Sequence, residues 1–487
     1  MLRIVSYALA FVLCAVIMAT VRARLVRQAA LLIASYALYM TWGVWFAGVL
    51  LASTVTNYFI GEWLRRKRSG LALSFGILLN LSLLGTFKYL PEAAVHLSFS
   101  SLHSFAHLAM PIGLSFWTFQ AMSYLFDVYQ GEEIDPSFFE FALYMVFFPV
   151  TISGPVCRMP DMLPQFRSDR VTRREEIAHG LRGIAAGVLM MQIARLLGQG
   201  ILAGDGVNSG FDRVTEWSAL DVWCLALAYG LQLFFDFAGY SHIAIGAAQA
   251  LGFTIPENFA RPFGSTSPSM FWTRWHMSLS FWIRDYVFFP LMQLRRQVWW
   301  RNLALFLSMV VFGLWHKATL LFLLWGAYHG VLLVLHRAIE GLERKYDWTP
   351  PQVPWSVLSW VSTIGLVSLG WIFFRSNSLS QAQRMLKAVV TPESYRVSYL
   401  TGSIYVLTAA LAVGYAMVLL LTDRLGRYSH AADSGGSSAE PPAGPMALLA
   451  RWQWFWLPPL YALALLCVLI VTLSQGTNAA QMMYGNF

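Results

Sequence analysis

The segments LQLFFDFAGYSHIAIG (231–246), FWTRWHMSLSFWIRDYVFFPL (271–291) and VFGLWHKATLLFLLWGAYHG (311–330) are mostly apolar, yet each carries ionisable side chains. A charged residue near the centre of a bilayer costs roughly 2.5–3.5 kcal/mol, so clusters of them usually face a cavity inside the protein. These segments therefore predict a buried polar site among membrane helices. Its ionisable candidates are Asp236, His242, Arg274, His276, Arg284, Asp285, His316, Lys317 and His329.

The composition of the whole chain supports a membrane protein. Of 487 residues, 57% are hydrophobic and only 12% are charged, whereas an ordinary soluble domain has about 25% charged residues. This excludes a soluble enzyme, a nucleic-acid reader and a disordered scaffold. Since a spanning helix needs roughly 20 apolar residues, we expect an all-α, polytopic membrane protein with roughly 11–14 membrane segments, some of which do not span. The apolar runs include 139–157, 276–292, 302–316 and 318–337.

The net charge of +9 fits membrane topology better than a nucleic-acid partner. Basic residues gather in short loops at 22–27, 65–68 and 158–174, as the positive-inside rule predicts for cytoplasmic loops. This places the N-terminus outside, and the first apolar run is expected to be a retained helix. Residues 425–450 are rich in Gly, Ser, Pro and Ala and are expected to form a flexible linker. The remainder, 1–424 and 451–487, is expected to form a single membrane domain with its core motifs at 105–337.

The spacing of His276 and His316 predicts that they lie at similar depth in the membrane. His276 and His316 lie roughly equally far along the chain from the polar turn at 294–297. If the flanking runs form an antiparallel hairpin, both lie about 30 Å from the turn, at similar depth. Pro290 should kink the first arm. On a straight helix His329 would lie about 20 Å from His316, and it would share this depth only if the chain breaks near Lys317.

A deep histidine can act as a general base. Burial favours the neutral imidazole, which can take a proton from a hydroxyl as that hydroxyl attacks an activated carbonyl. The chain has no GxSxG, HExxH, P-loop or GxGxxG motif, so neither a serine nucleophile nor a metal or cofactor site is indicated. Direct or relayed acyl transfer remains. A helix–helix hydrogen bond is the alternative role for either His316 or His329.

The ordered motifs resemble the membrane-bound O-acyltransferase (MBOAT) superfamily. The resemblance is to its bacterial branch of alginate O-acetylation and teichoic-acid D-alanyl transfer proteins, and it covers nearly the whole chain. The motifs are LLIASYALYMTW (31–42), FKYL (87–90), MPIGLSFWTFQAMSYLFDVYQG (110–131), FFPVTISGPVCRMPDMLPQF (147–166), PENFARPF (256–263) and the three segments quoted above.

This resemblance implies a ring of helices around a thin centre and roles for particular residues. His316 of GLWH matches the family's catalytic histidine, and His276 of RWHMSLS matches the second polar position of the signature. Arg274, Trp275, Arg284 and Asp285 match neighbours that shape a channel. The indoles expected to line it are Trp272, Trp275, Trp282 and Trp315. Either the two arginines hold donor phosphates, or they pair with Asp285 and Asp236.

Three positions depart from the family pattern or match it only faintly. Lys317 stands where the family usually has Gly, and it is expected either to bind an anionic donor or to reach solvent. His242 stands where Asp is frequent. Tyr484 lies in the terminal MMYGNF, which resembles the aromatic tails of the branch and would be an acyl relay or part of a frayed end.

The resemblance implies a bacterial inner-membrane O-acyltransferase. The expected donor is acetyl-CoA or another acyl thioester, including one on a carrier protein, and no cofactor or metal is expected to be bound. The expected acceptor is an exported polysaccharide, reached with a periplasmic acetyltransferase partner; membrane lipid surrounds the protein, and no nucleic acid is involved. Two alternatives remain open: D-alanyl transfer to teichoic acid or acylation of a lipid or protein, and a transporter or channel with a histidine proton relay.

Overall fold

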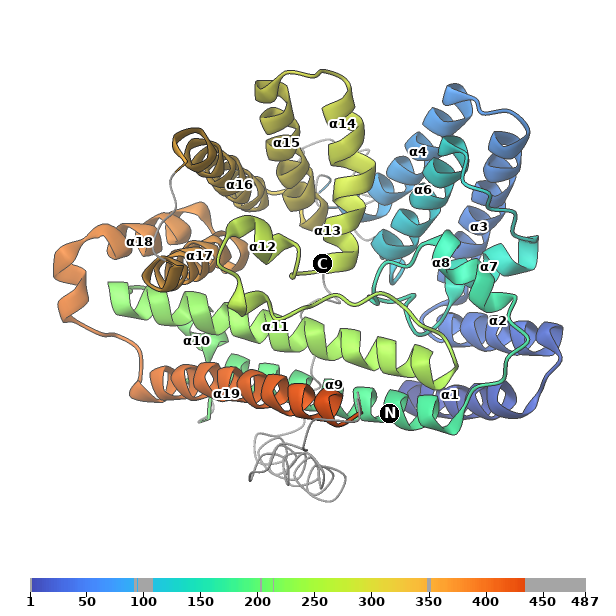
Figure 1. Ribbon diagram of the computed structural model, residues 1–487, viewed down its shortest axis with the longest axis horizontal. Helices are drawn as coiled ribbons and strands as arrows, with labels where there is room; N and C mark the ends of the chain where they lie inside the picture. The colour runs from blue at the N-terminus through green and yellow to red at the C-terminus, as the bar shows by residue number, and fades with distance from the viewer. Residues whose placement is uncertain are drawn as a thin grey trace. The chain divides into compact units, whose positions relative to one another are not determined.

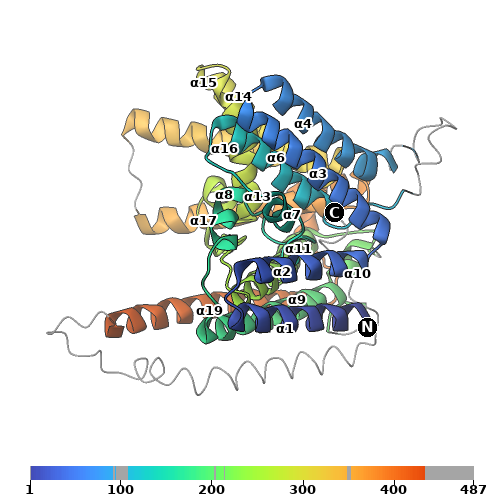
Figure 2. The same cartoon turned by 90° about the vertical axis from the view of Figure 1, so that its right-hand side faces the viewer.

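The described part of the chain is helical. A computed structural model describes residues 2–91, 94, 108–201, 204–212, 214–347 and 352–433, with side chains up to residue 420 in the last range. In these ranges every named element is a helix, and one isolated bridge joins Phe259 and Trp275 (Figures 1 and 2). The predicted all-α fold is confirmed. Tyr484 and most of the predicted linker lie outside the described residues, although the last helix extends to Asp433.

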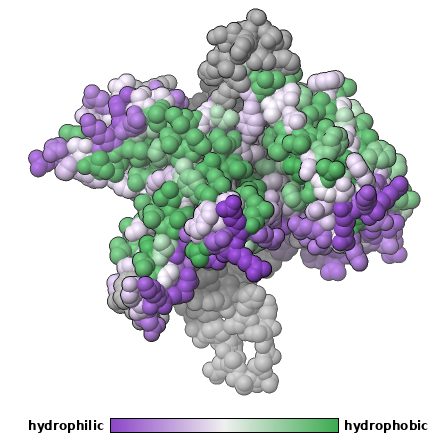
Figure 3. Space-filling model, turned by 90° about the horizontal axis from the view of Figure 1, so that it is seen from above, coloured by the Kyte–Doolittle hydropathy of each residue, from purple (hydrophilic) through white to green (hydrophobic). Residues whose placement is uncertain are grey.

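Eight of the described helices are long and apolar enough to cross a membrane. The multi-pass architecture predicted from composition is thereby confirmed. These spans are Val44–Arg66, Gly70–Tyr89, Arg174–Gln199, Ala219–Ala250, Val298–His316, Leu320–Tyr346, Pro354–Arg375 and Gly402–Leu420. Large apolar side chains are exposed on these helices, among them Phe59 and Leu71, and hydrophobic residues cover much of the face seen in Figure 3, as expected for helices that face lipid.

The chain divides into two compact units. The first contains residues up to Gly187 and Tyr240–Val367, and the second contains Val188–Gly239 and the described residues from Ser368 onward. The elements that lie wholly in the first unit are α1 (Leu2–Thr20), α2 (Arg24–Met40), α3 (Val44–Arg66), α4 (Gly70–Leu84), η1 (Gly85–Tyr89), α6 (Leu114–Gln130), α7 (Phe138–Val146), α8 (Met159–Phe166), η3 (Pro262–Gly264), α12 (Pro268–Trp272), α13 (Met277–Ile283), η4 (Arg284–Phe288), α14 (Phe289–Gln293), α15 (Val298–His316) and α16 (Leu320–Tyr346).

Three helices, α9 (Arg174–Gln199), α11 (Ala219–Ala250) and α17 (Gln352–Arg375), contribute to both units. The second unit also contains α10 (Val207–Asp212), α18 (Leu379–Val390), η5 (Pro392–Arg396) and α19 (Gly402–Asp433). Within it, Arg375 at the end of α17 pairs with Asp212 at 2.8 Å. Gln381 of α18 donates to the carbonyl of Phe211 at 2.7 Å. These contacts attach α17 and α18 to α10.

The first unit is built around α6, whose residues are nearly all buried. α3 and α4 pack against it (Figures 1 and 2). Asn57 and Asn80 join α3 to α4 by reciprocal amide hydrogen bonds of 2.7 and 3.3 Å. Both side chains are buried, and interhelical bonds of this kind hold membrane helices together where lipid offers no hydrophobic driving force.

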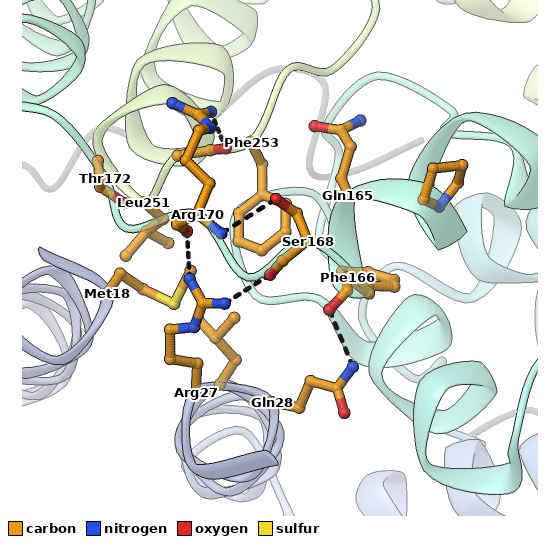
Figure 4. A pocket seen from close by; sticks show the side chains of 13 residues that line it. Met18, Arg27, Gln28, Gln165, Phe166, Ser168, Arg170, Thr172, Leu251 and Phe253 are labelled. Atoms are coloured by element: carbon orange, nitrogen blue, oxygen red, sulfur yellow. Dashed lines mark hydrogen bonds between the residues drawn. The ribbon is translucent and has the colours of Figure 1, made fainter. Parts of the chain in front are cut away.

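Basic segments from different parts of the sequence lie together. Arg27, near the start of α2, is buried and donates to the backbone carbonyls of Ser168 and Arg170, while Gln28 donates to that of Phe166 (Figure 4). These residues border a small cavity of about 260 Å³. Two of the predicted basic loops therefore lie on one side of the first unit, as expected if both face the same compartment.

Two of the predicted apolar runs are broken. The run at 139–157 contains the nine-residue α7, followed by turns. The run at 276–292 consists of α13, a π-helical turn (η4) and α14. Pro290 is the second residue of α14, one residue after this wide turn. It has no N–H to donate, and its ring would crowd the preceding turn of a straight helix, so the helix departs from regular α geometry next to the residue where the sequence predicted a kink.

The carboxylate of Glu140 caps the start of α7 and also forms an ion pair with Arg167. Ser137 and Glu140 form a capping box, in which the backbone N–H of Ser137 donates to Oε2 of Glu140 at 2.8 Å. Arg167 donates to both oxygens of Glu140 at 2.9 Å. The Arg167 guanidinium lowers the pKa of Glu140 from its usual 4.5 to about 2.

Glu140→Gln should therefore lower the free energy of unfolding by about 1–2 kcal/mol at neutral pH. The carboxylate has the lower pKa in the folded protein, so its contribution is fully present above pH 4.5 and disappears as the pH falls towards 2. Thermal unfolding of the detergent-solubilised protein should show a difference in melting temperature between wild type and variant that becomes smaller as the pH falls through this interval. A difference in melting temperature that does not change with pH would mean that the charge on Glu140 does not contribute to stability.

Candidate active site

His316 is the last residue of α15, where the chain reverses direction. Lys317 adopts an extended conformation with φ of −159°, and α16 begins at Leu320. The two helices pack closely along their length (Figure 1). His316 is only 2% exposed, so a long apolar hairpin holds its imidazole away from solvent.

Aromatic rings surround this imidazole. Phe312 stacks on it with ring centroids 5.4 Å apart, and Trp315 and Trp325 lie at 4.6 and 5.5 Å. Such surroundings favour the uncharged ring over the imidazolium. A neutral imidazole is the form that can accept a proton.

His276 lies between α12 and α13 and is fully buried. Its φ of 45° is in the left-handed region, which residues other than glycine rarely adopt. Backbone strain of this kind persists only where surrounding contacts enforce it, and it is frequent at functional sites.

Asn258 is the residue that fixes this strained turn. Its backbone carbonyl accepts from the N–H of Met277 at 2.9 Å, and its Oδ1 accepts from Oγ of Ser278 at 2.6 Å. The same oxygen lies 3.4 Å from Nδ1 of His276, and Nδ2 donates to Ser241 at 3.0 Å. Asn258 thus ties the PENFARPF segment to the histidine. Sequence reasoning quoted that motif but gave Asn258 no role; a polar amide in a buried, Pro-flanked segment was the available signal.

The two predicted histidines belong to one cluster. The ring of Phe312 lies 6.5 Å from that of His276 and 5.4 Å from that of His316. The segment from α13 to α14 and helix α15 form the predicted hairpin, joined at residues 294–297 (Figure 1). Both histidines lie at the end far from that turn.

His329 joins the same cluster. The straight-helix distance does not apply, because the chain breaks at Lys317. The rings of His316 and His329 lie 5.5 and 5.0 Å from that of Trp325, and Trp272 lies 5.1 Å from His329. Three buried imidazoles therefore share one aromatic environment.

Arg284 lies in an ion-pair cluster that includes an arginine the sequence did not single out. Asp285 pairs with Arg284 at 2.7 Å and with Arg158 at 2.6 Å. The Arg158 guanidinium also lies 5.1 Å from the ring centroid of Tyr286, whose hydroxyl donates to Asp127 at 2.6 Å. Of the two roles considered for Arg284, pairing with Asp285 is the one seen here. The sequence could not indicate this role for Arg158, because its ion-pair partner Asp285 is more than 120 residues away along the chain.

The other charged and polar candidates are more dispersed. Arg274 is half-buried, and its carbonyl accepts from Ala260 at 3.0 Å; within the described ranges it has no carboxylate partner. Lys317 is exposed. Asp236 belongs to the second unit, and Tyr484 lies outside the described residues.

The predicted tryptophans fall into separate groups. Trp315 contacts His316 and lies 5.3 Å from Phe119. Trp282 packs 4.3 Å from the same phenylalanine and donates to its carbonyl at 3.1 Å. Trp275 instead stacks on Phe271 at 5.4 Å. Phe312 and Trp325, which link the histidines, were not singled out from the sequence.

A cavity of about 360 Å³ lies beside the histidine cluster, with which it shares Trp272 and Phe312. Trp272 and Phe312 line it, as do Arg284 and Arg337. Phe312 is therefore both a cavity wall and a direct neighbour of His276 and His316. Among the described residues no group of three or more His, Cys, Asp or Glu side chains is arranged to hold a metal ion.

Comparisons with known proteins identify the family. Residues 99–380 match the membrane-bound O-acyltransferase family. A probable alginate O-acetylase of Pseudomonas syringae is 34% identical over 438 residues, 86% of this chain and 81% of that protein. A peptidoglycan O-acetyltransferase of Helicobacter pylori is 32% identical over 74% of this chain and 73% of its own length. A teichoic acid D-alanyltransferase of Bacillus subtilis is 31% identical over 54% of this chain and 68% of its own length.

These matches cover the histidine cluster, the hairpin that holds it and the cavity beside it. They confirm the suspected resemblance, and they favour an enzyme over the transporter or channel that the sequence left open. The chain therefore belongs to the membrane-bound O-acyltransferase family, and it is a multi-pass membrane acyltransferase.

Proposed function

We propose that this enzyme transfers an acetyl group from a cytoplasmic thioester across the bacterial inner membrane for O-acetylation of an exported polysaccharide, with His316 as the general base. The observation that carries this proposal is the burial of His316 in an apolar cluster next to a cavity that has basic side chains. Relatives named for the O-acetylation of alginate and of peptidoglycan match 74–86% of the chain.

The cavity suits a donor such as acetyl-CoA. Arg337 supplies positive charge for phosphate groups, while Trp272 and Phe312 offer an apolar wall for a thin pantetheine arm. The turn at 294–297 contains two arginines, and α16 ends with Arg344 and Lys345. By the positive-inside rule this end of the hairpin faces the cytoplasm, which is the side from which a thioester donor would enter.

The chemistry assigned to the cluster is direct. The acceptor hydroxyl attacks the thioester carbonyl while His316 takes its proton; the C–O bond forms, the C–S bond breaks, and the leaving thiolate takes the proton from His316. His276, held by Asn258, would orient the donor carbonyl or pass protons. The acceptor is either the polysaccharide itself or a periplasmic acetyltransferase partner, with Tyr484 proposed as the relay on this chain.

Acetyl transfer is favoured over D-alanyl transfer by the extent of the match. The acetylase relatives cover 74–86% of this chain, whereas the Bacillus subtilis D-alanyltransferase covers 54%. D-alanyl transfer from a carrier protein therefore remains the second candidate, and the experiment below includes it.

The test uses the purified full-length protein, labelled acetyl-CoA and an oligosaccharide acceptor, with and without a periplasmic extract. We expect release of free coenzyme A and label on the acceptor, and neither with a His316→Asn variant. Polysaccharide from cells that lack the protein should be lighter by acetyl-sized increments. Label transferred from a D-alanyl carrier but not from acetyl-CoA would replace this proposal by the second candidate.

A further inference from the structure

A lysine from a distant part of the sequence lies beside the catalytic cluster. Lys88 is in η1, a π-helical turn, and its Nζ lies 4.7 Å from the ring centroid of Trp315. The Trp315 ring is in turn 4.6 Å from that of His316. π-helical turns inside helices are rare and frequent at functional sites.

The Nζ of Lys88 is buried, and among the residues that the structure describes it has no hydrogen-bond or carboxylate partner. Among the described residues, it is the face of the Trp315 indole that balances its charge, and a cation–π contact provides about 2 kcal/mol when desolvated. Lys88 lies near the end of the span Gly70–Tyr89 and its Nζ is nevertheless buried; ionisable residues buried inside membrane proteins are usually functional.

The neighbouring residue attaches this turn to the end of α15. The hydroxyl of Tyr89 lies 3.2 Å from the carbonyl oxygen of Leu314 and 3.3 Å from that of Trp315. These carbonyls are among the last four of the helix, which have no partner within it. The Tyr89 contact therefore fixes the position of Lys88 relative to His316.

We propose that Lys88 is a further catalytic residue, whose ammonium stabilises the oxyanion that forms on the acyl carbonyl. This inference rests on the proposed function. As the acceptor oxygen bonds to the carbonyl carbon, the π pair moves to the carbonyl oxygen and the hydroxyl proton moves to His316. The oxyanion is then paired with Lys88. Its collapse re-forms the carbonyl and breaks the C–S bond, and the thiolate takes the proton from His316.

A preorganised charge in an apolar site acts mainly on the transition state, because charge develops there and water does not screen it. Lys88→Met keeps most of the length of the unbranched side chain and removes the charge. It should lower kcat for acetyl transfer by about 10²–10³-fold and leave KM for acetyl-CoA within about threefold of wild type. Lys88→Arg, which keeps the charge, should restore activity to within about tenfold.

A structural role would give a different pattern. A positive charge near the C-terminal end of α15 also stabilises the helix, and Tyr89→Phe serves as the control for lost anchoring at that end. If Lys88 were only structural, Lys88→Met would lower the melting temperature as Tyr89→Phe does, and the loss of activity would follow the loss of folded protein. That result would overturn the inference.

The remaining outcomes are also separable. An active wild type with a Lys88→Met variant that keeps its kcat within threefold would remove Lys88 from the mechanism and leave the proposed function intact. A raised KM with unchanged kcat would mean that Lys88 binds the donor instead, which also overturns the inference. A wild-type protein that transfers no acyl group from any thioester would end the proposed function, and the role of Lys88 with it.

Discussion

Replacement of His316 by asparagine should lower acyl transfer by about 10²–10⁴-fold, the range lost when a general base is removed. Asparagine keeps a polar side chain of similar reach but cannot take a proton at neutral pH. The imidazole makes its nearest described contacts with the rings of Phe312, Trp315 and Trp325, so the substitution should disturb packing little. Release of coenzyme A from acetyl-CoA, followed in the presence of acceptor, measures the effect.

A matched control is His179→Asn. His179 is an exposed histidine on α9 in the same unit, so its replacement should leave both activity and melting temperature at the wild-type level. A folded His316→Asn protein that still transfers acetyl groups at the wild-type rate would falsify the assignment of the general base. The helix–helix hydrogen bond considered from the sequence would then be its function.

Much of the fold follows from hydropathy and spacing. The scarcity of charge predicted membrane helices, and the position of the polar turn at 294–297 predicted a hairpin with His276 and His316 at one end. The π-helical turn just before Pro290 lies where the missing N–H of proline predicted a distortion of the helix. Each of these features depends on residues that are near one another in sequence. Counting residues along a helix, or identifying a turn residue or a proline, is therefore enough to predict it.

The contacts that complete the candidate site depend on distant segments, so the sequence could not predict them. Asn258 reaches His276 only because a backbone pairing of Phe259 with Trp275 brings PENFARPF beside the histidine. Lys88 reaches Trp315 across more than 220 residues, and the FKYL motif that contains it predicts neither the π-helical turn nor the partner on α15. For His329 the sequence left two geometries open, a straight helix and a break near Lys317, and the structure has the break.

Gly326→Val should lower the free energy of unfolding by about 3 kcal/mol, because α15 and α16 touch through their backbones. A Cβ at Gly326 would collide with the carbonyl oxygen of Met309 and lie 3.0 Å from the Cα of Val310. Gly313 on α15 has the same relation to Phe322. Small residues at such crossings allow the close approach that holds membrane helices together. Thermal unfolding should show a large drop in melting temperature.

Gly341→Ala is the control on the same helix. A Cβ at Gly341 meets nothing within 4 Å, and alanine favours a helix over glycine by about 1 kcal/mol, so this variant should melt at or slightly above the wild-type temperature. Acyl transfer by Gly326→Val should fall with its stability, since the displaced α16 carries Trp325 away from His316. If Gly326→Val had the same melting temperature as Gly341→Ala, α15 and α16 would not cross as closely as the structure shows. The position of His316, at the end of α15, would then also be in question.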